Sequence, residues 1–260
     1  MKISIITATY NSAKTITSCI VSLNNQNYQN IEHIIIDGQS KDNTVEIIKS
    51  YSNDNLKLFS EPAKGIYDAL NKGLDLATGD IIGFVHSDDI LASPTVLETI
   101  SNVVEGGNID GVYGDLVYVD RDDTTREIRY WKSKEFQSSL LNNGWMAPHP
   151  TLFLKKDVYL KHGYFNLKYK IAADYDFMLR IFSDNSLKFK YLPILVAKMR
   201  TGGKSNKTIS NLLQKSYEDY QALRANRISN SLWVLAKKNF SKLPQFFNKR
   251  RSILFLASFF

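Results

Sequence analysis

The chain has 260 residues, of which 43% are hydrophobic and 23% are charged. This composition excludes a disordered or collagen-like protein. The single cysteine, Cys19, excludes an internal disulfide and a cysteine-based zinc site. No apolar run approaches the roughly 18–20 residues that span a bilayer, and the first residues lack the form of a signal peptide. We therefore expect a cytoplasmic protein with an ordinary core.

The net charge of +7 is unevenly distributed along the chain. Residues 1–219 carry 25 basic and 26 acidic side chains, whereas the residues after Asp219 carry eight basic side chains and no acidic one. A basic protein is a candidate for nucleic-acid binding, but the near-neutral body argues against that class. The charge pattern instead predicts a body and a tail with different roles.

The first hundred residues alternate between short apolar runs and helical patterns. The expected strands are Ile3–Thr7, Ile31–Asp37, Leu56–Phe59 and Ile81–Val85, and the expected helices are 13–26, 42–52 and 65–77. This alternation is typical of an α/β fold whose mostly parallel sheet is covered by helices on both faces.

The pattern changes after residue 110. Two strand-like segments, Gly111–Asp120 and Thr125–Trp131, are joined by an acidic turn and predict a hairpin. A helical stretch follows, and after it come the expected strand Thr151–Leu154, helix Asp174–Ser183, strand 188–192 and helix 207–226. We expect one domain over 1–206, with a nucleotide-binding part (about 1–110) and an acceptor part (about 111–206), and a basic helical extension over 207–260.

Polar side chains follow three of the first four strands, where a parallel sheet binds its ligands. They are Thr7, Thr9 and Asn11 after the first strand, Asp37 after the second, and Asp88 and Asp89 after the fourth. The sequence contains no Gly-rich phosphate loop of the Walker or dinucleotide-binding type. A nucleotide would therefore need a carboxylate for its base or sugar and a metal ion for its phosphates.

Each acidic residue also has an ordinary structural explanation. The pair Asp88–Asp89 supplies hard oxygen ligands for Mg²⁺ or Mn²⁺, but acidic pairs more often cap a helix or face solvent. Asp37 precedes a glycine and is typical of a turn. Asp174 and Asp176 begin an amphipathic helix, where a carboxylate caps the helix or, alternatively, acts as a general base. His149, between two prolines, is a loop histidine or a ligand of a metal or phosphate.

These motifs, taken together and in this order, resemble the family 2 glycosyltransferases. The resemblance covers roughly residues 1–206 and is closest to bacterial enzymes that build surface polysaccharides, of the colanic-acid transferase type. It rests on the runs Ile3–Asn11, Ile34–Thr44, Gly65–Gly73, Ala77–Asp80, Ser87–Asp89, His149–Pro150, Ala173–Asp176 and Arg200–Ser205.

The resemblance implies a GT-A fold and an inverting hexosyl- or N-acetylhexosaminyl-transferase that depends on a divalent metal, Mn²⁺ or Mg²⁺. It implies a nucleotide-sugar donor, with a UDP-sugar expected, and a carbohydrate or lipid-linked acceptor. Asp174 corresponds to the catalytic base. The implied binding residues are Thr7, Thr9, Asn11, Asp37, Asp68, Lys72, Asp88, Arg200 and a mobile loop with Gly202, Gly203 and Ser205; the implied metal ligands are Asp88, Asp89 and, as a further candidate, His149.

Two positions depart from the family pattern. Many relatives have an acidic residue two positions before Asp88, where this chain has His86, so the identity of the metal ligand stays open. The residue before the catalytic aspartate is often glutamate and is here Ala173, which removes one candidate base and favours Asp174.

The basic tail and the overall function each allow more than one interpretation. Residues 229–260 combine basic and aromatic side chains, as in a helix that lies on an anionic membrane at the inner face of the cell, or in a helix that packs on the body. The alternatives to a transferase are a glycoside hydrolase, a catalytically silent sugar-nucleotide-binding protein and a nucleic-acid-binding protein.

Overall fold

The computed structural model describes residues 1–202 and 209–240. The strands are β1 (Ile3–Thr9), β2 (Ile31–Asp37), β3 (Leu56–Ser60), β4 (Ile81–Phe84), β5 (Asp89–Leu91), β6 (Gly111–Val119), β7 (Glu127–Trp131), β8 (Phe153–Lys155) and β9 (Phe189–Arg200). The α-helices are α1 (Ile16–Asn24), α2 (Thr44–Ser50), α3 (Ile66–Leu76), α4 (Val96–Glu105), α5 (Lys156–His162), α6 (Ala173–Phe182), α7 (Ile209–Ala225) and α8 (Ser231–Phe240). Two 3₁₀ helices, η1 (Ser138–Asn143) and η2 (His149–Thr151), complete the described elements.

The nine strands form one mixed sheet in the order β3-β2-β1-β4-β8-β6-β9-β5, and β7 pairs with β6. The first four strands are parallel, as the sequence predicts. β8 runs antiparallel to both β4 and β6, so it joins the parallel half to the second half of the sheet. The predicted hairpin is confirmed, because β6 and β7 pair in antiparallel register. The fold is thus α/β with a mixed, mostly parallel sheet.

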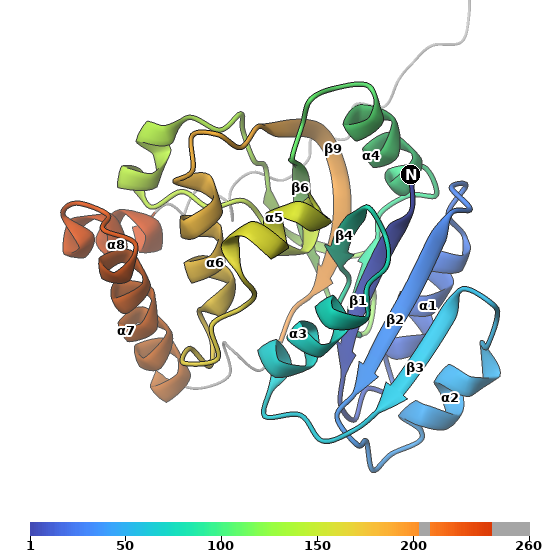
Figure 1. Ribbon diagram of the computed structural model, residues 1–260. Coiled ribbons are helices and arrows are strands. Elements are labelled where there is room, and N and C mark those ends of the chain that lie inside the picture. Colours follow the sequence, from blue (N-terminus) through green and yellow to red (C-terminus); the bar gives the residue numbers. More distant parts are fainter. Residues whose placement is uncertain (203–208, 241–260) are drawn as a thin grey trace, which may run out of the picture.

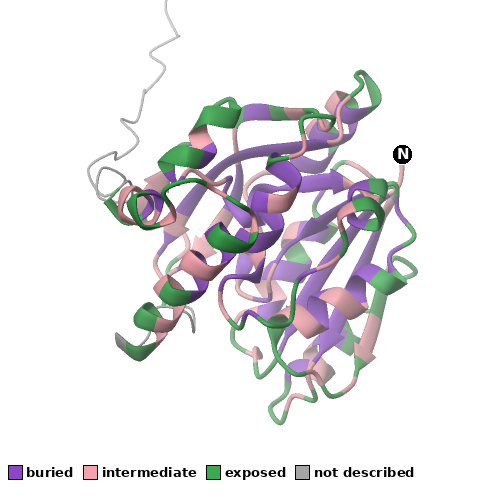
Figure 2. Ribbon diagram, turned by 60° about the vertical axis from the view of Figure 1, so that its left-hand side comes forward, coloured by how far each residue is buried: buried purple, intermediate pink, exposed green. Residues whose placement is uncertain are grey.

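Helices cover both faces of this sheet (Figure 1). Alternate side chains of β1 enter different cores: Ile3 and Ile5 pack with α1, α2 and α4, whereas Ile6 and Ala8 pack with α3, α5 and α6. The strands are largely buried, and the exposed residues gather on loops and on the outer sides of helices (Figure 2). A strand buried on both faces is mostly apolar, which explains the apolar runs in the sequence, and its buried polar side chains must be met by hydrogen bonds.

Several elements differ from the expectation. The three-residue strand β5 and the helices α4 and α5 had no predicted counterpart, and β9 continues to Arg200 where the prediction stopped at 192. The helical stretch predicted after β7 is the short 3₁₀ helix η1. β9 carries a proline and two register shifts against β6, which hid its length from a periodicity argument.

One glycine sets the distance between α3 and the sheet. A Cβ on Gly73 would lie 2.3 Å from Cγ2 of Ile6 in β1, so only glycine permits this approach. The close packing brings the first turn of α3, which carries Tyr67 and Asp68, up to the carboxyl ends of the strands.

The last two described helices pack on the body. Ala222 and Leu223 of α7 and Val234 of α8 belong to the same core cluster as α6, and Figure 1 shows the three helices together on the side away from β2 and β3. Lys238 is 2% exposed and lies 2.9 Å from Oδ1 of Asp219 in an ion pair. For α8, the packed interpretation of the tail is therefore confirmed; residues 241–260 lie outside the described part. No helix in the described ranges is long and apolar enough to cross a membrane.

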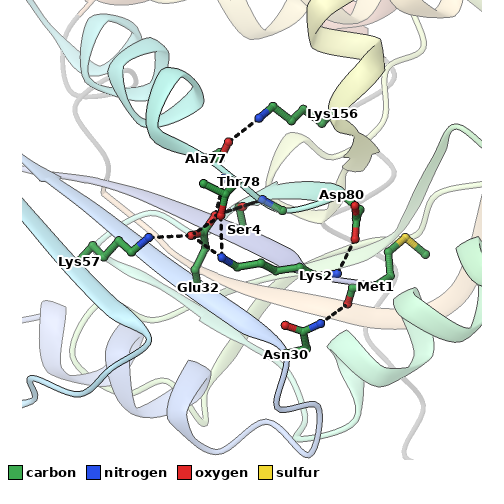
Figure 3. Close-up of polar contacts among 11 residues, drawn as sticks. Met1, Lys2, Ser4, Asn30, Glu32, Lys57, Ala77, Thr78, Asp80 and Lys156 are labelled. Atoms are coloured by element: carbon green, nitrogen blue, oxygen red, sulfur yellow. Dashed lines mark hydrogen bonds and ion pairs between the residues drawn. The ribbon is translucent and has the colours of Figure 1, made fainter.

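A buried carboxylate joins the amino-terminal ends of the parallel strands (Figure 3). Glu32 of β2 is 2% exposed and accepts hydrogen bonds from the Ser4 hydroxyl (2.5 Å) and the Thr78 backbone N–H (2.6 Å). The ammonium groups of Lys2 and Lys57 lie 2.9 and 3.1 Å from its other oxygen. Although burial acts in the opposite direction, these donors hold the pKa of Glu32 well below its ordinary value. One side chain thus connects β1, β2, β3 and the turn before β4.

We expect Glu32→Gln to lower the free energy of unfolding by about 3 kcal/mol, since it removes a charge that several donors share. Urea denaturation at neutral pH measures this loss. Lys57→Met is the matched control: Lys57 is 45% exposed, so its loss should cost less than about 1 kcal/mol. Because the folded pKa is depressed, the contribution of Glu32 is present above the ordinary carboxyl pKa of about 4.5 and is lost as the pH falls below it. Equal urea midpoints for wild type and Glu32→Gln would show that the contacts of Glu32 do not stabilise the fold.

Candidate active site

The carboxyl ends of β1 and β2 are tied to one another. Thr9 and Asp37 are register partners, and the N–H of Gly38 donates to the Thr9 carbonyl at 2.9 Å. Asn11 has a left-handed backbone (φ 51°), and its side-chain oxygen accepts the Lys41 N–H at 2.8 Å. The Thr9 hydroxyl oxygen is buried and has no hydrogen-bond partner among the described residues. These loops therefore present Thr9 and Asn11 at the expected edge of the sheet.

Two predicted contact residues lie deeper than expected. Thr7 has no exposed surface; its hydroxyl donates to the Val85 carbonyl (2.6 Å) and lies 2.9 Å from Nε2 of His33. Asp37 is also fully buried and accepts bonds from the Ser40 N–H and hydroxyl and from the Ser60 hydroxyl. Thr7 therefore supports the strand from inside instead of lining a pocket. A contact between Asp37 and a base would require the serine bonds to open.

Asp89 is a buried carboxylate without a partner. It begins β5, opposite Met199 of β9, and is 0% exposed. Neither of its carboxylate oxygens has a hydrogen-bond partner in the described part of the chain. Burial and, to a smaller extent, the neighbouring Asp88 raise its pKa well above the ordinary value, and Arg200 opposes this shift. Such a group is costly unless a cation or a donor meets it.

Arg200, at the end of β9, bonds to the backbone of Asp88, next to Asp89. Its Nη1 donates to the Asp88 carbonyl at 2.9 Å, and its Nε donates to the Arg121 carbonyl at 3.0 Å. The side chain is 9% exposed, so both bonds are largely shielded from water. The next residues of the predicted binding loop are described only as far as Gly202, which has a left-handed backbone (φ 90°) and accepts a bond from Arg121. Gly203 and Ser205 lie outside the described residues.

Two histidines, His86 after β4 and His149 in η2, lie close to one another. The His149 ring stacks on Phe84 with a centroid distance of 5.4 Å and lies 6.1 Å from the His86 ring. Burial lowers the pKa of His149 to about 4, so this ring is neutral at physiological pH, and burial also lowers the pKa of His86. The carboxylate of Asp174 opposes both shifts, and Asp88 opposes the shift of His86. Asp174 therefore acts electrostatically on both rings, and Asp88 acts on that of His86.

Asp174, in the first turn of α6, is held through one of its two oxygens. Oδ1 accepts the backbone N–H of Tyr175 at 2.8 Å and the hydroxyl of Tyr67 at 3.1 Å. The same Tyr67 hydroxyl lies 2.7 Å from the Ile171 carbonyl, so its single proton is shared between the two acceptors. Among the described residues no donor reaches Oδ2. Asp176, the other candidate base, is buried and bonds to Arg180 and Asn226, so the structure favours Asp174.

The predicted phosphate-side residues on α3 make only local contacts. The Asp68 carboxylate accepts the Lys64 N–H at 2.9 Å and so caps the loop before the helix. The Lys72 ammonium donates to the Pro62 carbonyl at 2.6 Å and lies 3.3 Å from a carboxylate oxygen of Glu61. Both residues follow β3 in the chain. Among the described residues, neither side chain bonds to Asp88 or Asp174.

Comparison with known proteins decides the family. Residues 4–163, more than half of the chain, match the sequence profile described as Glycosyl transferase family 2. The chain belongs to glycosyl transferase family 2. A PGL/p-HBAD biosynthesis glycosyltransferase of Mycobacterium bovis is 30% identical over 208 residues, which is 78% of each chain. Chondroitin synthase of Pasteurella multocida is 31% identical over 235 residues, which is 88% of this chain and 24% of that protein.

Solved structures confirm the fold of this family 2 member. S. aureus TarS 1-349 in complex with UDP-GlcNAc has a TM-score of 0.70 at 20% identity, with 92% of this chain and 72% of that chain covered. The mannosyltransferase PcManGT from Pyrobaculum calidifontis, in complex with GDP-Man and Mn2+, has a TM-score of 0.65 at 16% identity, with 95% and 73% covered. The predicted GT-A fold is confirmed, and the chain is a glycosyltransferase.

Tyr67 is a neighbour of Asp174 that the sequence does not predict, although it lies beside Asp68 in the run Gly65–Gly73. An aromatic residue at a helix start carries no specific signal, and its partner Asp174 is 107 positions away. In the sequence, His86 stands out only as a departure from the family pattern. Its half-buried ring, whose pKa burial lowers, depends on the packing between β4 and η2 and has no signature in the chain.

Proposed function

We propose that this glycosyltransferase moves a sugar from a nucleotide-sugar to an acceptor hydroxyl in glycan synthesis, with inversion at the anomeric carbon. The observation that carries the proposal is the arrangement of Asp174, whose Oδ1 is held by Tyr67 and the Tyr175 N–H while no donor among the described residues reaches Oδ2. A UDP-sugar is the expected donor, which the fold likeness to a structure holding UDP-GlcNAc supports.

The donor would lie across the carboxyl ends of β1 and β2. In the proposal, Thr9 and Asn11 face the nucleotide, and Asp37 orders the loop around it through Ser40 and Ser60. Asp68 and Lys72 approach the ribose and the diphosphate, for which Lys72 exchanges its contacts with Pro62 and Glu61. Arg200 and Lys72 would stabilise charge on the departing diphosphate. The loop that starts at Gly202, with Gly203 and Ser205, stays a predicted donor contact.

A divalent cation, Mn²⁺ or Mg²⁺, fits the residues present at Asp88 and Asp89. Asp89 has two buried oxygens without a partner, which is the state expected of a carboxylate that meets a cation. No set of three or more His, Cys, Asp or Glu side chains that could hold a metal occurs in the described residues, so a diphosphate would complete the ligands. When bound, the ion would neutralise charge on the diphosphate. His149 stays a further candidate ligand.

Asp174 would act as the general base. Tyr67 and the Tyr175 N–H fix Oδ1, so Oδ2 is directed to the acceptor hydroxyl. The acceptor oxygen forms a bond to the anomeric carbon as the bond to the phosphate oxygen breaks. The hydroxyl proton passes to Asp174, and the nucleoside diphosphate leaves with the electron pair. One displacement inverts the centre and requires no enzyme nucleophile.

The acceptor is proposed to be a carbohydrate or a lipid-linked sugar, and the inner membrane face is the proposed location. The exposed side of α8 supports this: Leu232, Trp233 and Phe240 are 70%, 62% and 70% exposed. Aromatic and aliphatic side chains beside lysines are typical of helices that lie on anionic lipid. Lys238 does not contribute, because it is buried against Asp219.

We expect Asp174→Asn to reduce turnover by about 10²–10⁴-fold, since the amide cannot take the acceptor proton. Donor affinity should be unchanged. A thermal-shift screen of UDP-, GDP- and dTDP-sugars with Mn²⁺ selects the donor, calorimetry gives its affinity, and nucleoside diphosphate release gives the turnover. Asp157→Asn, the same change at an exposed helix start, should behave as wild type. Near-normal turnover of Asp174→Asn would refute the assignment, and an inactive wild type that binds donor would favour the silent binding protein.

Asp89→Asn should have two effects of opposite sign. It relieves a buried charge without a partner, so the metal-free protein should gain about 1 kcal/mol of stability. The rise in melting temperature that Mn²⁺ with UDP gives the wild type should disappear. Differential scanning fluorimetry with and without Mn²⁺ measures both. A variant that keeps the full Mn²⁺ response would exclude Asp89 as a ligand.

The double variant Leu232→Ser with Trp233→Ser should lose flotation with vesicles of phosphatidylcholine and phosphatidylglycerol, because it removes apolar surface from the proposed membrane side of α8. Leu160→Ser with Leu167→Ser is the control, since these leucines are 63% and 51% exposed on other elements. Flotation that is the same for both double variants would argue against α8 as the membrane side.

A further inference from the structure

Glu218 of α7 bonds to the three residues that lead into α6. Its Oε1 accepts the Lys170 N–H at 3.2 Å, and its Oε2 accepts the Ile171 and Ala172 N–H groups at 2.8 and 3.0 Å. The side chain is 5% exposed, so these bonds are shielded from water. The partners lie 46 to 48 positions earlier in the chain, immediately before the helix that carries Asp174.

This contact replaces a local helix cap. The N-cap residue of α6 is Ala172, which has no side chain able to bond the helix start. Glu218 instead supplies a carboxylate from another helix, and its negative charge also suits the positive end of the α6 dipole. Gln214, one turn earlier in α7, donates to Oε1 at 3.0 Å and keeps the carboxylate in this orientation.

The peptide of Ile171 is held from both sides. Its N–H goes to Glu218, and its carbonyl accepts the Tyr67 hydroxyl at 2.7 Å. The same hydroxyl lies 3.1 Å from Oδ1 of Asp174. A shift of the segment 170–172 therefore moves both Asp174 itself and the hydroxyl that fixes one of its oxygens.

We propose that Glu218 is a positioning residue for sugar transfer: it fixes the segment 170–172 so that Oδ2 of Asp174 meets the acceptor hydroxyl. The inference rests on the proposed role of Asp174 as base. A carboxylate is needed because three N–H groups and one amide point at it, and it accepts at both oxygens. A glutamine accepts at one oxygen only, and its NH₂ group would face an N–H donor. A misplacement of about 1 Å at a reacting group costs on the order of 10²-fold in rate.

Glu218→Gln tests the proposal in the full-length chain, in wild type and in the Asp174→Asn background. The assay follows UDP release from UDP-GlcNAc with octyl glycosides as acceptors, or nucleoside diphosphate release from the donor that the thermal-shift screen selects. We expect the single variant to lose about 10–100-fold in kcat with the donor Kd changed less than about twofold. In the Asp174→Asn background it should cause no further loss, since residues that act as one unit are not additive.

Lys215→Met is the matched control on the same helix. Lys215 pairs with Asp219 and, among the described residues, makes no bond to the segment 170–172, so this variant should keep its kcat. Hydrogen exchange gives a readout besides activity. Amides of residues 166–176 should exchange faster in Glu218→Gln and unchanged in Lys215→Met. If Glu218→Gln does not fold, Glu218→Asp keeps both oxygens on a shorter side chain and should show the same pattern with a smaller loss.

The outcomes separate this inference from the proposed function. If Asp174→Asn is inactive but Glu218→Gln turns over normally, the positioning role is wrong and the base assignment stands. If Glu218→Gln lowers kcat equally in both backgrounds, or weakens donor binding in parallel, its role is only structural. If Asp174→Asn keeps its turnover, the base assignment itself fails.

Discussion

A carboxylate that is removed from water must be met by donors, and the described structure uses this requirement to join distant segments. Glu32 unites β1, β2 and β3 with the turn before β4. Asp115 of β6 accepts bonds from Tyr130 and Ser133 on one side and from Tyr191 of β9 on the other. Each carboxylate is a fixed point because leaving any donor unpaired is costly. Glu32 therefore ties together the strands of the parallel half, and Asp115 ties β6 to β9 at the point where their register shifts.

Asp89 departs from this pattern, and its position explains why. Among the buried carboxylates of the described residues, it is the one for which neither oxygen has a hydrogen-bond or ion-pair partner. The remaining buried acids show that the fold can supply donors where stability requires them. In the proposed function, this unsatisfied carboxylate is the group that a cation brought by the donor would meet. The cost in stability would then be the counterpart of a capacity to bind.

The fold is predicted well from the sequence where an element depends on a pattern of neighbouring residues. Strands β1, β2 and β4 are rich in apolar residues because they are buried on both faces, and the intervening helices show their own period. The three residues of β5 are too few for any period, so the sequence predicts Asp89 only as a carboxylate that follows the fourth strand. The depth of Thr7 was also hidden, because a threonine after a strand looks the same whether it faces a ligand or the neutral ring of His33. Contacts across a hundred positions, such as Tyr67 with Asp174, leave no local pattern.

The C-terminal helices change the meaning of the basic tail. Its charge suggested an appendage with a separate role, yet α7 and α8 share the core of α6, and the predicted boundary after residue 206 does not divide the packing. Lys238 is buried above the Tyr175 ring, with its ammonium 3.1 Å from the ring centroid, and Glu218 bonds to the segment before Asp174. The positive charge of Lys238 thus pairs with the buried Asp219 of α7 and helps α7 and α8 to pack together. Because Tyr175 adjoins Asp174, the packing that secures these helices also holds the neighbour of the proposed base, and the proposed reaction would depend on the stability of the C-terminal helices.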